Sequence, residues 1–489
     1  MQRRHFLQAG AALAGLGAQS ALHALPSVDT FLQRAAQDRR VRAFAGIEHE
    51  LAAGPLRTTG RWPAGLAGRF YRNGPARLQR GGERVGHWFE GDGMVQQFRI
   101  AAGRITHQGR FVQTSKLVAE ERAGRLLYPM FGGEAPRAPV TGPDSVNVAN
   151  TNAIEVGGRV LALWEGGSAY ALDPESLATQ GPVVWQPGWE GLPFSAHPKL
   201  DPQGRLWNFG TMGDKLALYQ IGADGRLEKA QLGTLPVRSV MAHDAAVTER
   251  YFVLPLPPLR YEAGDKGLTF RWHGDEPLRV LVVDKQDVNR QVIFELPPEM
   301  VFHVAHAWER PDGTLVLGYM GSPDGGFLQE AQHLMAGQLR PGAPACTVQV
   351  ELDLKTRRWR RHAFDDQAEF PRIHPQRIGQ PCRWLLSVAS WGAARPVFAH
   401  GLQWRDLQSG RVHRYDFGPH YVVEEHVVVP KQGARREDDA WALGTSYDLR
   451  RGTTQLNLFD LRAIESGPIA QAFLPYALPL GFHGNFTPG

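Results

Sequence analysis

The sequence contains very little cysteine. Only Cys346 and Cys382 occur in 489 residues, and they form no Cys-x-x-Cys motif. Zinc sites built from thiolates and disulfide-rich scaffolds are therefore excluded, because both need several closely spaced cysteines. A single disulfide between these two residues is left open.

Long hydrophobic runs and long helical patterns are also scarce. After the first 25 residues, no apolar stretch approaches the roughly 20 residues that cross a bilayer as a helix. Apolar residues follow a helical period only near residues 28–43 and 325–336. The 55 Gly and 35 Pro residues would interrupt a mainly helical protein too often. The chain is therefore expected to be mostly β.

Neither sign of charge dominates the sequence. Its 54 Lys and Arg residues and 49 Asp and Glu residues give a formal net charge of +5. The densest basic run, at residues 355–361, is predicted to be an exposed strand or turn, because nucleic-acid-binding proteins normally build a wider basic face. We expect no nucleic-acid partner. The sequence also shows no Ser/His/Asp arrangement or phosphate-binding glycine loop that would compete for a catalytic role.

The first 25 residues are predicted to be a signal peptide. Arg3 and Arg4 are followed by Phe-Leu and then by an Ala, Leu and Gly run that is too short to span a bilayer stably. This pattern is typical of twin-arginine signals, although a cytosolic helical extension would look similar. Cleavage after Ser20 or after Ala24 would each leave a small residue at the cut. We expect export to the periplasm of a protein that loads its cofactor in the cytoplasm.

Residues 26–489 are predicted to form a single β domain. Short β-rich runs alternate with Gly, Asp, Asn and Pro turns, for example at 201–209 and 312–319. No linker or low-complexity stretch divides them. Radial repetition of four-stranded sheets is the natural way to build so large an all-β domain. The pattern favours a propeller over a pair of sandwiches, although no WD or kelch repeat is present.

Four of the 18 histidines stand in apolar settings that look like strand ends. They are His197, His243, His303 and His483. The wide separation of these four residues excludes a local metal motif such as His-Glu-x-x-His. It is typical of a site to which different blades each send one residue toward a central axis. Neutral imidazoles are ligands that suit iron, copper or zinc.

Ten short sequence strings, some of them around these histidines, occur in a characteristic order between residues 45 and 486. They are FYRNGP (70–75), HWFEGDGM (87–94), NTN (150–152), LWEGG (163–167), AHPK (196–199), MAHD (241–244), the segment 303–309, EFPRI (369–373), EDD (437–439) and FHG (482–484). Together they resemble the carotenoid cleavage oxygenase family, which includes retinoid isomerohydrolase and stilbene-cleaving oxygenases. The resemblance implies an all-β fold, a seven-bladed β-propeller with a helical and loop cap over an axial iron site.

The same resemblance implies that the four histidines named above bind one Fe(2+). The third ligand could be His303 or His306, and alignment on the following Ala-Trp-Glu places it at His303. His306 then stands where the family usually has Asn. A role for His306 beside the metal is left open.

Metal-bound imidazoles need an acceptor for their second ring N–H, and the family uses three glutamates for this purpose. The expected pairs are Glu165 with His243, Glu369 with His303, and Glu425 with His483. The alternative for Glu165 and Glu369 is a surface carboxylate in a turn. Glu425 matches less well, because another Glu precedes it and His426 replaces the usual Pro.

By resemblance, the reaction splits one C=C bond of a carotenoid or apocarotenoid with O2, the co-substrate, and yields two carbonyl products. Thr151 matches a position whose methyl group crowds the sixth iron site in relatives, and a buried strand Thr is the alternative. Trp164 stands where stilbene cleavers tend to carry a Lys that contacts the phenol oxygen. The apolar face of Trp suits a polyene better.

Alternative functions and partners are left open. A stilbene- or phenylpropene-cleaving oxygenase is the first alternative, and a non-oxidative isomerase or hydrolase and a non-catalytic carotenoid-binding protein are further ones. An apolar substrate could arrive from a membrane surface through residues 126–131, if these form an exposed patch with a basic rim. A buried core strand is the other interpretation of that segment. The sequence does not determine the oligomeric state.

Overall fold

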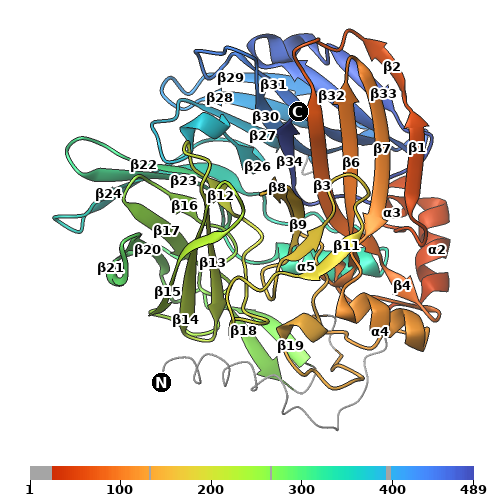
Figure 1. Cartoon of the computed structure of the whole chain (residues 1–489), viewed down its shortest axis with the longest axis horizontal. Helices are drawn as coiled ribbons and strands as arrows, with labels where there is room; N and C mark the ends of the chain where they lie inside the picture. The colour runs from red at the N-terminus through yellow and green to blue at the C-terminus, as the bar shows by residue number, and fades with distance from the viewer. Residues whose placement is uncertain (1–24, 132–133, 265–266, 393–397) are drawn as a thin grey trace.

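Seven β-sheets form a ring in the computed structural model, which describes residues 25–131, 134–264, 267–392 and 398–489 (Figure 1). Each sheet has four or five antiparallel strands, and the innermost strands of successive sheets contact one another around the axis. The fold is therefore a seven-bladed β-propeller, as predicted. The signal-peptide prediction falls on residues 1–24, outside the described residues, whereas Leu25 is already buried in the core.

The first four blades succeed one another around the ring in the order of the sequence. From the axis outward, blade 1 contains β34 (Gly484–Pro488), β3 (Gly68–Arg77), β6 (Asp92–Ala101), β7 (Arg104–Phe111) and β1 (Leu51–Pro55). Blade 2 contains β8 (Asn152–Val156), β9 (Arg159–Leu163), β10 (Tyr170–Leu172) and β11 (Thr179–Pro182). Blade 3 contains β12 (Lys199–Leu200), β13 (Leu206–Met212), β14 (Lys215–Ile221) and β15 (Leu227–Thr234). Blade 4 contains β16 (Ala246–Val247), β17 (Tyr251–Leu256), β20 (Leu278–Asp284) and β21 (Asp287–Leu296).

The last three blades complete the ring. Blade 5 contains β22 (Met300–Glu309), β23 (Thr314–Ser322), β24 (Cys346–Asp353) and β25 (Trp359–Ala363). Blade 6 contains β26 (Gln367–Arg372), β27 (Trp384–Ser390), β28 (Gly401–Asp406) and β29 (Val412–Asp416). Blade 7 contains β30 (Tyr421–Pro430), β31 (Ala440–Asp448), β32 (Thr453–Asp460), β33 (Ala470–Phe473) and β2 (Arg57–Gly60).

Both ends of the chain close the ring. The N-proximal strand β2 pairs with β33 at the outer edge of blade 7, and the C-terminal strand β34 pairs with β3 at the axis of blade 1. These exchanged strands join the first and last blades by backbone hydrogen bonds, so the ring leaves no open seam between them.

The hydrophobic core lies between neighbouring blades. One apolar cluster joins blades 2 and 3, and another joins blades 4 and 5. The middle strands are Val- and Leu-rich because both of their faces meet another blade, and all residues of β31 are buried. The outermost strand β25, which includes part of the basic run 355–361, is exposed throughout, as predicted.

Helices and one extra hairpin cover one side of the ring (Figure 1). They are α2 (Val28–Gln37), α3 (Arg39–Arg42), α4 (Ser115–Ala123), α5 (Phe327–Met335), and the β18 (Leu259–Gly264)–β19 (Gly267–Trp272) hairpin. The helical segments near 28–43 and 325–336 were predicted, but α4 was not. Its buried face contains Lys116 and Glu120, which pair with each other, so its apolar period is weak.

Smaller elements complete the description. A short hairpin pairs β4 (Gln79–Arg80) with β5 (Glu83–Arg84), and one-turn helices lie at η2 (Trp88–Glu90), η3 (Pro143–Ser145), η4 (Pro375–Arg377) and η5 (Leu461–Ser466). Cys346 and Cys382 are both free thiols, so the disulfide left open by the sequence does not form. In the described part of the chain, no helix is long and apolar enough to cross a membrane.

Candidate metal centre

Four histidines meet at the axis of the propeller. The ring nitrogens of His197, His243, His303 and His483 all lie within 4.8 Å of one another, and all four residues are buried. The Nε2 atoms of His197 and His243 are 2.8 Å apart, and those of His303 and His483 are 3.1 Å apart. Each histidine lies at or near the start of an innermost strand: β12, β16, β22 and β34.

The three glutamates come from the remaining blades. Glu165 follows β9 of blade 2, Glu369 lies in β26 of blade 6, and Glu425 lies in β30 of blade 7. The four histidines come from blades 1, 3, 4 and 5. Every blade therefore supplies one residue to the centre, which explains why the sequence shows no local motif.

Bulges in the innermost strands direct some of these side chains toward the axis. The register of β22 shifts on both sides of Val304, next to His303, and that of β30 shifts between Val423 and His426, around Glu425. In β26 the shift follows Glu369, where Phe370 adopts a left-handed backbone with φ 53°. Bulges next to functional sites commonly re-aim one side chain out of the regular alternation of a strand.

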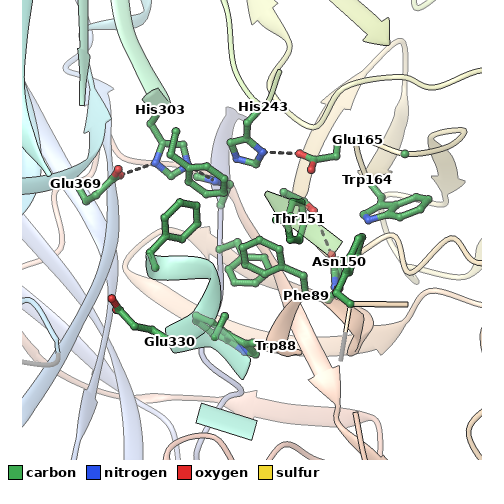
Figure 2. Close-up of a pocket in the computed structure, with 18 of the residues that line it drawn as sticks. Trp88, Phe89, Asn150, Thr151, Trp164, Glu165, His243, His303, Glu330 and Glu369 are labelled. Atoms are coloured by element: carbon green, nitrogen blue, oxygen red, sulfur yellow. Dashed lines mark hydrogen bonds and ion pairs between the residues drawn. The ribbon is translucent and has the colours of Figure 1, made fainter. Parts of the chain in front are cut away.

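Three histidines donate a hydrogen bond to the carboxylate with which the sequence paired them. Nδ1 of His243 contacts Oε2 of Glu165 (Figure 2). Nδ1 of His303 lies 2.5 Å from Oε2 of Glu369 (Figure 2). The third pair joins Nδ1 of His483 to Oε1 of Glu425 at 3.0 Å. These contacts fix Nδ1 as the protonated nitrogen and leave each Nε2 lone pair directed at the other imidazoles.

The three carboxylates are themselves held in different ways. Oε1 of Glu165 accepts the hydroxyl of Tyr261 at 3.3 Å. Glu369 accepts the backbone N–H of Phe370 at 2.6 Å. Neither of these two glutamates forms an ion pair with a Lys or Arg among the described residues.

Glu425 differs because it has a cationic partner. Both of its oxygens accept hydrogen bonds from Arg372, at 2.8 and 2.9 Å, and Oε2 also accepts the backbone N–H of Gly484. Burial alone would raise the pKa of Glu425, but Arg372 and His483 outweigh it and hold that pKa well below its usual range. Glu425 therefore stays ionised although it is buried.

The protonation of the imidazoles follows their surroundings. Burial, followed by the neighbouring histidines, lowers the pKa of His197 well below its usual range. Burial also lowers the pKa of His483 to about 4. For His303 burial acts in the same direction, but the Glu369 carboxylate outweighs it and the pKa is raised.

This donor set fits a metal cation. Lone pairs on imidazole nitrogens about 3 Å apart repel one another unless a positive charge lies between them. Neutral imidazoles are ligands for iron, copper and zinc. The two carboxylates without a Lys or Arg partner, Glu165 and Glu369, together match the charge of one divalent ion.

His306 lies outside the group of four. It is buried in β22 and its ring packs against Gly318 of the neighbouring strand, where an added Cβ would lie 2.4 Å from Nε2. Its Nδ1 has no hydrogen-bond partner among the described residues, and burial lowers its pKa to about 4. His306 therefore acts as a core residue, and the role beside the metal that the sequence left open is not seen.

A cavity of about 990 Å³ lies beside the histidines. His243, His303 and His483 line it, whereas His197 does not. Its walls are mainly apolar and include many aromatic rings, and Phe302 stacks on His243 with ring centroids 3.7 Å apart. The other aromatic lining residues are Phe44, Trp88, Phe89, Phe131, Trp164, Tyr261, Phe270, Phe327, Phe370, Phe398 and Phe482.

Thr151 and Trp164 both line this cavity (Figure 2). The Thr151 hydroxyl donates to Oδ1 of Asn150 at 3.1 Å, and its carbonyl accepts the backbone N–H of His483. Trp164 packs with Met130 in a small apolar cluster. The structure thus places both residues in the wall of the cavity that three of the histidines also line.

The segment 126–131 is neither an exposed patch nor a strand. It has an irregular backbone, and Leu126, Pro129 and Met130 are buried. Met130 and Phe131 line the cavity, and their backbone N–H groups both donate to the buried Glu90. The segment is therefore part of the cavity wall.

Sequence reasoning missed four polar residues around the centre: Lys199, Asp244, Tyr261 and Arg372. Lys199, Asp244 and Arg372 lie inside strings that carried the resemblance, so their positions were visible without a role. Tyr261 lies in the β18–β19 hairpin, where no local pattern marked it.

The chain is similar to oxygenases over almost its full length. A family model described as retinal pigment epithelial membrane protein matches residues 44–488. An apocarotenoid-15,15'-oxygenase from Synechocystis sp. is 31% identical over 464 residues, which cover 88% of this chain and 92% of the relative. Resveratrol cleavage oxygenase 1 from Aspergillus fumigatus is 27% identical over 468 residues, which cover 89% of this chain and 92% of the relative.

Solved structures show the same similarity. A cobalt-substituted Synechocystis apocarotenoid oxygenase has a TM-score of 0.83 and 27% identity, and the match covers 92% of this chain and 98% of that one. Other solved forms of that oxygenase carry replacements of a Thr, a Trp and a Glu. Their mutual spacing is that of Thr151, Trp164 and Glu165.

Proposed function

The chain belongs to the carotenoid cleavage oxygenase family, and we propose that it is an Fe(II)-dependent dioxygenase that cleaves one C=C bond of a carotenoid or apocarotenoid. The observation that carries the proposal is the meeting of four buried imidazoles with a large aromatic cavity. The 31% identity to an apocarotenoid oxygenase supports the choice of substrate class.

The four histidines at the axis would hold the iron. Bound Fe(II) would supply the activation of O2 beside an electron-rich double bond. Imidazole is a ligand that iron accepts, and the solved structure of a cobalt-substituted relative supports metal binding in this fold. The Glu165 and Glu369 carboxylates orient His243 and His303 and make them better donors.

The cavity walls would bind the polyene and exclude water from it. Phe89 packs against both Phe302 and Phe482, and these rings offer apolar surface to a conjugated chain. Because the Thr151 hydroxyl is engaged with Asn150, we propose that Thr151 presents its methyl group toward the metal. It would then limit access to one coordination position.

Trp164 favours a polyene over a phenolic stilbene. Its side chain lines the cavity directly before Glu165, and Trp provides an apolar face where a Lys could bind a phenol oxygen. Replacing Trp164 with Lys should raise the ratio of turnover on a hydroxylated stilbene to turnover on an apocarotenal. An unchanged ratio would show that Trp164 does not determine which of the two substrates is preferred.

Stilbene cleavage is the second candidate, because a resveratrol cleavage oxygenase is 27% identical over nearly the same length. The two candidates separate in one experiment. Iron-loaded protein is incubated with β-carotene, several apocarotenals and resveratrol, and the products are identified by mass spectrometry. Aldehydes from a polyene support the proposal, whereas benzaldehydes from resveratrol alone favour the second candidate. Tight retention of a polyene without product, at verified iron occupancy, would identify a carrier.

We also propose that the protein is exported to the periplasm by the twin-arginine route. The support is the sequence pattern around Arg3 and Arg4. Replacing both arginines with Lys should retain the protein in the cytoplasm, as measured by cell fractionation. Equal periplasmic amounts of the variant and the parent protein would contradict this proposal.

A further inference from the structure

His197 differs from the other three histidines of the centre. Among the described residues, no glutamate accepts its Nδ1, and it does not line the cavity. When its Nε2 is directed at the other imidazoles, Nδ1 carries the proton and needs an acceptor. Among the described residues, the carboxylate within 4 Å of that nitrogen is Asp244, whose Oδ2 lies 3.8 Å away.

Asp244 occupies a junction of three blades. It directly follows His243 in the chain, and its Oδ2 accepts the backbone N–H of Val304, which directly follows His303. Its Oδ1 accepts the backbone N–H of Ala245 and pairs with Lys199 at 2.8 Å. Lys199 in turn lies two residues after His197. One buried carboxylate thus contacts residues that lie within two positions of three of the four histidines.

We propose that Asp244 is the positioning residue for His197, and therefore the fourth carboxylate of the centre. This inference rests on the proposed metal site. A separation of 3.8 Å is too long for a direct hydrogen bond, but one bridging water or a small rotation of the imidazole closes it. The three short contacts to Val304, Ala245 and Lys199 fix the carboxylate, so the imidazole is the group that adjusts.

Lys199 sets the strength of this fourth carboxylate. The ammonium of Lys199 neutralises the charge of Asp244. The carboxylate is therefore a weaker acceptor for the Nδ1–H of His197 than an unpaired carboxylate would be. His197 should therefore be the weaker donor when compared with His243, whose Glu165 has no basic partner among the described residues.

The first test is Asp244→Asn, which keeps the shape of the side chain and removes its charge. Affinity for Co(II) is measured by anaerobic competition with a chelator, and the visible absorption of the Co(II) form is recorded. We expect affinity to fall by about 10- to 100-fold, the usual effect of losing a carboxylate that supports a metal-bound histidine. Wild-type affinity with an unchanged Co(II) spectrum would overturn the proposal.

Asp201→Asn is the matched control. Asp201 is a buried carboxylate of blade 3, the blade that carries His197, and it accepts hydrogen bonds from Arg205 and from Trp207 Nε1, away from the histidines. This variant should lose thermal stability and keep its Co(II) affinity. If Asp201→Asn weakened Co(II) binding as much as Asp244→Asn, the effect would be general loosening of blade 3, and the proposal would fail.

Lys199→Met gives a second test with the opposite sign. Without its ammonium, Asp244 becomes a stronger acceptor for His197 Nδ1–H. Co(II) affinity should then stay equal or rise a few-fold, although Tm falls because a buried charge loses its partner. A ten-fold loss of Co(II) affinity would show that the Lys199–Asp244 ion pair only stabilises the local structure and does not tune His197. If the parent protein itself binds no Co(II), the proposed metal site fails, which differs from a failure of Asp244 alone.

Discussion

The metal centre has two unlike halves. Glu165 and Glu369, which hold His243 and His303, expose 20% and 30% of their side chains and have no Lys or Arg partner among the described residues. Asp244 and Glu425, beside His197 and His483, expose only 3% and 6%. Each of these two carboxylates pairs with a cation, either Lys199 or Arg372.

The difference shows how burial decides which carboxylates keep a free charge. A fully desolvated carboxylate is costly without a cationic partner, whereas a partly solvated one at a cavity wall can stay unpaired. The deeply buried half is therefore electrically balanced. The partly exposed half, called the cavity half although His483 and Glu425 also line the cavity, keeps two negative charges, which can offset a divalent ion. We expect changes to the cavity half to weaken metal binding with little loss of stability, whereas removal of a cation from the buried half should lower stability.

The largest effect is expected for a histidine of the cavity half. His243→Ala removes a nitrogen from the centre, and we expect metal affinity to fall by more than the roughly 100-fold that follows loss of a supporting residue. Oxygenase activity should disappear with it. Metal content by mass spectrometry and product formation check this result, and full activity in the variant would refute the site assignment.

Arg372→Gln tests the buried half. It leaves the buried Glu425 without its cation, so we expect the free energy of unfolding to drop by about 3 kcal/mol. Urea unfolding measures this loss. Arg99→Gln is the control, because Arg99 and its partner Glu175 are both about half exposed, and its loss should cost about 1 kcal/mol or less. Equal losses of unfolding free energy in both variants would show that the buried pair does not differ from an exposed pair.

Glu369→Gln tests the cavity half with the same kind of change. It removes the charge from the acceptor of His303 Nδ1–H, and we expect metal affinity to fall by about 10- to 100-fold. The free energy of unfolding of the metal-free protein should change little, because Glu369 is partly exposed. If stability falls as in Arg372→Gln while metal affinity stays constant, the two halves do not differ as described.

Tyr261→Phe should have the smallest effect of the series. The phenol donates to Glu165 at 3.3 Å, and phenylalanine keeps the cavity wall while removing this hydrogen bond. Such a bond contributes about 0.5–1.5 kcal/mol, so metal affinity should change by less than about ten-fold. The measurement is chelator competition, and a loss as large as that of Glu369→Gln would move Tyr261 among the principal supports of the site.

Much of the architecture was predictable from local chemistry. Alternating short β runs and Gly or Asp turns indicate many antiparallel strands, and the order of motif strings points to one propeller. The four histidines, Glu165 and Glu369 could be named because each lies in a recognisable string, and Glu425 could be named from a weaker match. Helix α4 escaped prediction because its buried Lys116 and Glu120 satisfy each other and hide the helical period.

The contacts that distinguish the two halves could not be predicted in this way. Arg372 reaches Glu425 only because β26 and β30 are both bulged next to these residues. Asp244 meets Lys199 and Val304 because blades 3, 4 and 5 converge at the axis. These pairings depend on register shifts and on the order of blades in space, and neither leaves a pattern in a single stretch of sequence.

The most direct test of the proposed function is a labelling experiment. Iron-loaded protein is given one apocarotenal under ¹⁸O₂, and the aldehydes are reduced immediately with borohydride to stop exchange with water. We predict that the carbonyl groups created at the broken double bond each carry one ¹⁸O atom, and that protein with His243→Ala gives no product. Cleavage products with oxygen from water, or equal turnover by the variant, would contradict this account.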